Sequence, residues 1–64
     1  MPPQPKPNPH MVSVAELVTK DDSALIAWRA SAREELSRNP DARLQGLYDA
    51  STTEMAERAA RAWR

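Results

Sequence analysis

Apolar residues are arranged symmetrically on the two sides of the tripeptide Asn39-Pro40-Asp41, and this arrangement constrains the fold of the 64-residue chain more than any other feature. Successive apolar positions on each side are three or four residues apart, so each set lies on one face of a helix. Counted outward, the facing pairs are Leu36 with Leu44, Ala32 with Tyr48, Trp28 with Ser51, and Leu25 with Met55. Small residues oppose large ones, which lets two helices interdigitate. The pattern predicts an all-α fold built on an antiparallel helical hairpin.

Local signals predict a short helix before the hairpin. Ser13-Val14-Ala15-Glu16 matches a capping box, which favours a helix over residues 14–19. A strongly periodic stretch then predicts the first long helix over residues 22–38. Extending the hairpin register outward brings Trp63 near the short helix. We therefore expect the short helix to fold over the open end of the hairpin and cover Trp63.

The second long helix is predicted to begin at the hairpin turn. Asn39 is a good N-cap and Pro40 suits the first helical position, so the helix should start near Pro40. A second capping box, Ser51-Thr52-Thr53-Glu54, leaves open a break near Ala50. Because the apolar stripe keeps its phase through this point, one continuous helix is favoured.

The amino-terminal segment has a different composition. It holds all but one of the six prolines, which remove backbone donors and fix φ. We expect residues 1–12 to form a disordered Pro-rich arm and residues 13–64 to form the helical hairpin domain. Pro2 and Pro5 give one P-x-x-P spacing of the sort that groove-binding domains recognise, although a plain linker explains the segment as well.

Composition limits the classes of function. Nine basic residues balance nine acidic ones, which weighs against DNA or an anionic membrane as the default partner. The chain has no Cys to staple it and no Phe, so its core is thin and a protein partner or a second copy is expected to supply further burial. No apolar run is long enough to cross a bilayer, and the start lacks the features of a signal peptide. A cytoplasmic location is the default expectation.

No arrangement of residues indicates catalysis. His10 is the single histidine and has no Cys or second His nearby, whereas a metal site needs three or four ligands. The serines have no base at a recognisable spacing, which a serine nucleophile requires. We therefore predict a protein that is not an enzyme and has no cofactor, metal or small-molecule substrate.

Two kinds of binding remain. The first is a protein-protein interaction module that self-associates or docks onto a larger protein, with partner contacts predicted at Ile26, Leu47, Trp28 and Trp63. Core packing is the competing role for the two tryptophans, since both lie on apolar stripes. The alternative is a small DNA-binding regulator, in which residues 41–64 form a helix-turn-helix-like segment if the helix breaks near Ala50. Its nucleic-acid contacts would be Thr52, Thr53, Arg58, Arg61 and Arg64.

Overall fold

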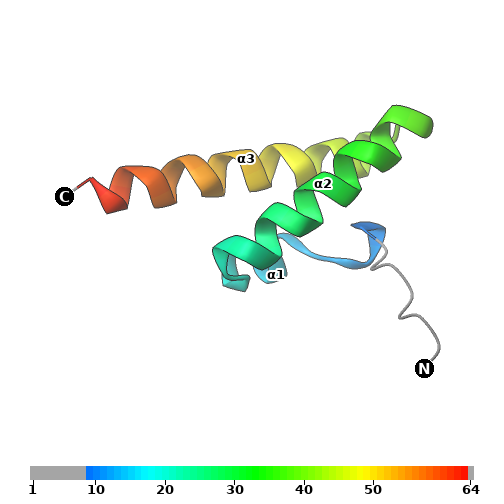
Figure 1. Cartoon of the computed structure of the whole chain (residues 1–64). Coiled ribbons are helices and arrows are strands. Elements are labelled where there is room, and N and C mark those ends of the chain that lie inside the picture. The colour runs from blue at the N-terminus through cyan, green and yellow to red at the C-terminus, as the bar shows by residue number, and fades with distance from the viewer. Residues whose placement is uncertain (1–8, 64) are drawn as a thin grey trace, which may run out of the picture.

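A computed structural model describes residues 9–63, and this part of the chain is helical without strands (Figure 1). The elements are a 3₁₀ helix and three α-helices: η1 (Pro9–Met11), α1 (Val14–Thr19), α2 (Asp22–Arg38) and α3 (Ala42–Ala62). α2 packs against α3, α1 packs against α3, and η1 packs against α2. The predicted all-α hairpin is confirmed, and so are the bounds predicted for the first two α-helices.

The hairpin seam forms the core that the symmetric pattern predicts. Leu25 and Ala32 on α2 and Leu44 on α3 are fully buried. Ser51 is also fully buried, and its hydroxyl donates to the Tyr48 carbonyl at 2.6 Å, so this polar group is satisfied. The remaining buried apolar residues are Leu17, Trp28 and Leu47, with Val12, Leu36, Tyr48 and Met55 packed against them.

Side-chain caps fix the starts of α1 and α2. The Ser13 hydroxyl accepts from the Glu16 backbone N–H at 3.3 Å, which is half of the predicted capping box. Asp21 accepts from the Ala24 N–H at 2.7 Å and caps α2. Only two residues separate α1 from α2, and this short connection holds the end of α1 beside the start of α2.

The hairpin turn differs from the prediction by two residues. Asn39 ends α2, with its N–H donating to the Glu35 carbonyl at 2.8 Å, and it does not cap α3. The cap is Asp41, whose Oδ1 accepts from the Leu44 N–H at 2.9 Å. α3 therefore starts at Ala42 and runs unbroken to Ala62, so the break considered near Ala50 is absent.

Replacing the α3 cap tests this assignment. Asp41→Ala is expected to lower the free energy of unfolding by about 1 kcal/mol, because the Leu44 N–H loses its acceptor. Asn39→Ala is the matched control and should cost clearly less, since Asn39 lies outside α3. Urea unfolding followed by far-UV circular dichroism measures both, and the opposite ranking would assign the cap to Asn39.

Part of the predicted arm has fixed structure. Pro9–Met11 form η1, and Val12 packs against the core. The reason lies on α2, where the buried Trp28 indole needs an acceptor for its N–H. Its Nε1 donates to the Pro9 carbonyl at 3.3 Å, and a proline can accept although it cannot donate. Residues 9–12, which belong to the predicted arm, thus contact α2 and the core, and residues 1–8 of the arm lie outside the described residues.

The prediction that α1 covers Trp63 is also wrong, because this side chain is 90% exposed. α3 has 21 residues and α2 has 17. At about 1.5 Å per residue, α3 is longer by about 6 Å. The short α1–α2 connection keeps α1 beside the start of α2, so α1 cannot follow α3 to its end. The last turns of α3 consequently project past the other helices (Figure 1).

Candidate interaction surface

The two flanks of the hairpin are unlike each other. On one flank, η1 covers α2 near Trp28, and the imidazole of His10 lies 3.9 Å from the Glu35 carboxylate. α1 covers α3 on this same flank, where Leu17 and Leu47 share the core cluster. We call the opposite side, which neither η1 nor α1 covers, the open flank.

Arg29 closes the seam on the open flank. Its guanidinium carbon lies 5.0 Å from the centre of the Tyr48 ring, within the range of a cation–π interaction. Its Nη2 atom donates to the Tyr48 hydroxyl at 3.4 Å and to the Thr52 hydroxyl at 3.1 Å. Arg29 Nε is buried without a hydrogen-bond partner among the described residues. This contact holds α2 to α3 and occupies Thr52, one of the predicted nucleic-acid contacts.

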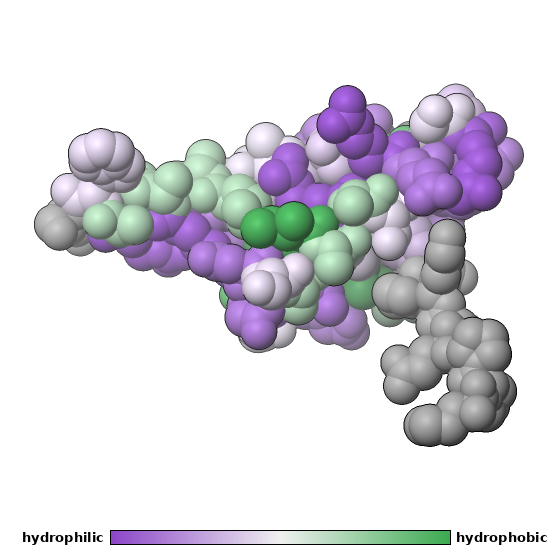
Figure 2. Space-filling model, in the orientation of Figure 1, coloured by the Kyte–Doolittle hydropathy of each residue, from purple (hydrophilic) through white to green (hydrophobic). Residues whose placement is uncertain are grey.

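Apolar side chains continue along the open flank beyond Arg29. Ile26 precedes Arg29 by three residues, lies on the same side of α2 and is 55% exposed. On α3, a set of uncharged residues at helical spacing runs toward the exposed Trp63. We call this set the C-terminal stripe: Met55, Ala59, Ala62 and Trp63. In Figure 2, hydrophobic surface occupies the middle of the molecule and continues along α3 toward its carboxyl end.

The structure separates the four predicted partner contacts into two groups. Ile26 and Trp63 are accessible, at 55% and 90% exposure. Trp28 and Leu47 are buried, at 4% and 8% exposure, and cannot present a docking surface in this conformation. Leu47 was predicted to contact a partner. It is buried instead because α1 supplies a third packing surface, and Leu17 and Leu47 belong to the same core cluster.

Arg58 joins all three α-helices on the covered flank. Its Nη1 atom lies 2.8 Å from the carboxylate of Asp22, and its Nε atom lies 2.7 Å from that of Glu54. Its Nη2 atom donates to the backbone carbonyls of Lys20 at 2.6 Å and Val18 at 3.3 Å. Only the contact with Glu54, four residues earlier on α3, follows from local spacing, because the others depend on where α1 lies.

Glu54 lies at the centre of this cluster and is only 8% exposed. The hydrogen bond from Arg58 holds the pKa of Glu54 below its ordinary value of 4.5, although desolvation opposes this shift. The same hydrogen bond raises the pKa of Arg58 above its ordinary value. Arg61 also lies 3.2 Å from the Glu54 carboxylate.

The structure places the predicted nucleic-acid contacts in different environments. A helix-turn-helix needs a turn within residues 41–64, but α3 is continuous from Ala42 to Ala62. The Arg58 side chain is 18% exposed and is engaged by carboxylates and carbonyls. Thr53 and Arg61 remain exposed, and Arg64 lies outside the described residues.

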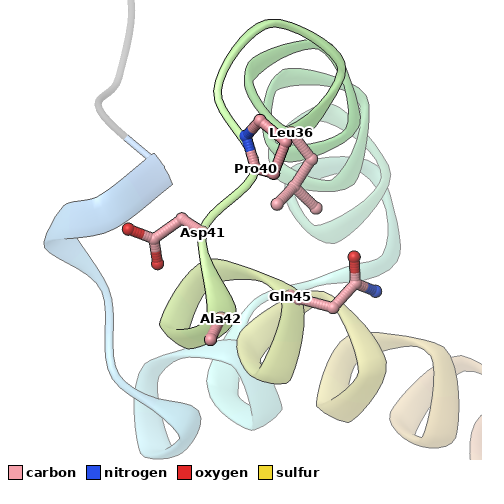
Figure 3. Close-up of a pocket in the computed structure, with 5 residues that line it drawn as sticks. All are labelled: Leu36, Pro40, Asp41, Ala42 and Gln45. Atoms are coloured by element: carbon pink, nitrogen blue, oxygen red, sulfur yellow. The ribbon is translucent and has the colours of Figure 1, made fainter.

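A shallow pocket of about 310 Å³ lies at the hairpin turn (Figure 3). The residues that line it are Leu36, Pro40, Asp41, Ala42 and Gln45. Figure 3 shows the Asp41 carboxylate pointing away from Leu36 and Gln45, in keeping with its role as the cap of α3. The lining therefore offers apolar contacts and an amide, and it does not bring together an acid, a base and a nucleophile.

Within residues 9–63, no cluster of His, Asp and Glu side chains could hold a metal ion. In the same part of the chain, no helix is both long and apolar enough to span a membrane. No protein-family model matches the chain, and neither a curated protein nor a solved structure matches it. The open flank, with its exposed apolar side chains, is therefore the feature of the described residues that points to a function.

Proposed function

We propose that the protein is a non-enzymatic interaction module that binds a protein chain through its open flank. The observation that carries the proposal is the exposure of large apolar side chains on this flank, with Ile26 on α2 and Trp63 at the end of α3. Exposed tryptophans commonly anchor protein interfaces, because they bury a large area when a partner packs on them. The mixed flank, with Arg29 and Thr52 beside apolar residues, also resembles the composition of such interfaces.

A helical partner suits the shape of this surface. The residues of the C-terminal stripe recur every three or four positions, which is how one helix packs along another. Ala59 and Ala62 are small and exposed, so a partner backbone can come close to α3. Ile26 extends the contact from α3 onto α2.

Electrostatics favour a protein partner over a nucleic acid. The chain carries nine basic and nine acidic residues, whereas phosphate binding is driven by an excess of basic charge. Arg58 and Arg61 both contact the Glu54 carboxylate, which offsets part of their charge. The open flank contributes two basic residues: Arg29, whose guanidinium lies over the Tyr48 ring, and the exposed Arg33 one turn further along α2.

Photocrosslinking in cells tests the proposal. A photoreactive residue at Ile26 or Ala59 is expected to give protein adducts, because both positions face the proposed partner. The matched control is Ala27, which is exposed on α2 but points about 100° away from Ile26. Equal labelling at all three positions, or none, would contradict the proposal, and adducts removed by nuclease would support the DNA-binding alternative.

A further inference from the structure

We infer that the open flank binds a second copy of this chain, with the C-terminal stripes of two α3 helices packed antiparallel about Ala59. This inference rests on the proposed function and names its partner. Three features of the described residues support it: the continuity of the seam, the symmetry of the stripe and the placement of charge around it.

The C-terminal stripe lies on the face of α3 that packs against α2, and it extends beyond the point where α2 begins. α2 begins at Asp22, which lies beside Arg58 through their 2.8 Å ion pair. Met55 still packs against the core, whereas Ala59 and Trp63 lie beyond this point and are exposed. The same face of α3 thus has a helix packed on its first part, whereas no other element among residues 9–63 packs on it in the last turns. A helix from outside the protomer can extend the seam.

The spacing of the stripe is self-complementary. Met55 and Trp63 are each four residues from Ala59, so the three lie close to one line on α3. A twofold axis at Ala59 brings Met55 of each copy against Trp63 of the other copy. Small residues meet at the centre, where the helix axes must come closest. An isologous contact requires this kind of symmetry, in which one patch meets an identical patch.

Charge around the stripe favours an identical, uncharged surface as the occupant. The charged residues of the last turns point at least about 100° away from Ala59 on the helix, at 3.6 residues per turn; they are Glu54, Glu57, Arg58 and Arg61. The Glu54 carboxylate also offsets part of the charge of Arg58 and Arg61. Arg58 borders the stripe beside Ala62, but Asp22 and Glu54 hold its guanidinium. A charged peptide would therefore find little free charge along the stripe, and a second copy brings little like charge against it.

Dimerisation would also supply burial that a single copy lacks. The buried apolar core of the described residues holds four leucines, one tryptophan and one alanine. A domain of this size has little surface to bury by itself, and association is one common remedy. Trp63, at 90% exposure, is the largest side chain that a second copy could cover.

Substitutions at the twofold axis give a test specific to a second copy. Because residue 59 faces residue 59 of the other copy, Ala59→Glu and Ala59→Arg should each leave the protein monomeric in sedimentation. An equimolar mixture of the two variants should restore the dimer, since opposite charges then meet. Ala27→Glu and Ala27→Arg are the matched controls and should remain dimeric, and circular dichroism should show that all four variants keep their helices.

A cysteine at the axis gives an independent readout. The chain contains no Cys, so Ala59→Cys introduces a single thiol, which should form a symmetric disulfide on mild oxidation, whereas Ala27→Cys should not. Wild-type protein that stays monomeric across a concentration series, or equal disulfide formation at both positions, would overturn the inference. In that case, crosslinks from Ile26 and Ala59 to a different protein would leave the proposed function standing. If neither a dimer nor such crosslinks are found, both the inference and the proposed function are wrong.

Discussion

Leu25→Ala is expected to unfold a large part of the protein at room temperature. Leu25 is fully buried in the seam, and removing most of a buried leucine side chain costs roughly 2–5 kcal/mol. A single core in a domain below about 70–80 residues supplies only about 3–5 kcal/mol. The substitution therefore removes most of the available stability. Thermal and urea unfolding followed by circular dichroism measure the loss.

The adjacent residue provides the control for Leu25. Ile26→Ala removes a side chain of the same size from the same turn of α2, but Ile26 is 55% exposed. Its effect on the free energy of unfolding should stay within about 0.5 kcal/mol, as for other surface positions. Similar losses for the two variants would mean that the seam is not the core of the protein.

The second large effect is expected at Arg58. Arg58→Met keeps the apolar stem but removes the guanidinium that joins Glu54, Asp22 and the end of α1. Glu54 is then left poorly solvated without its closest partner, which destabilises the folded state. We expect a lower melting temperature and faster hydrogen exchange in α1. Arg38→Met is the control, because Arg38 pairs with Glu34 at the exposed end of α2 and should have little effect.

The pH dependence of stability distinguishes this ion pair from simple packing. The pKa of Glu54 is lowered in the folded state, so its contribution to stability is fully present above its ordinary value of 4.5. That contribution is lost as the pH falls below this value and through the lower folded pKa. The wild-type protein should therefore lose more stability on acidification than Arg58→Met. Parallel acid profiles would show that the pair contributes nothing specific.

The helices and their main contact face could be predicted from the sequence because both depend on local spacing. The capping box that begins at Ser13 and the apolar repeat through Leu25 are short-range signals, and the structure places α1 and α2 at the predicted residues. The predicted start of α3 was two residues too early, because Asn39 was assigned as the cap, and Asp is as good a capping residue as Asn. The structure selects Asp41, and Asn39 serves as the end of α2.

The candidate surface was predicted only in part. Ile26 was placed correctly as an exposed residue, since an apolar side chain next to a seam position has nothing on its own helix to cover it. Leu47 and Trp63 were placed wrongly, and for one reason. Their burial depends on where α1 packs along α3, and that position follows from the two-residue link between α1 and α2 rather than from the periodicity of either helix.

Local sequence patterns account for the elements: three α-helices, the antiparallel pairing of the long two, and the set of residues between them. These follow from interactions between residues three or four apart and from the symmetry about Pro40. Three features come from the packing of the helices: α1 covers one flank, Arg58 connects three helices, and the end of α3 projects with Trp63 exposed. Such features depend on contacts between residues far apart in the chain, whose distances no local pattern encodes.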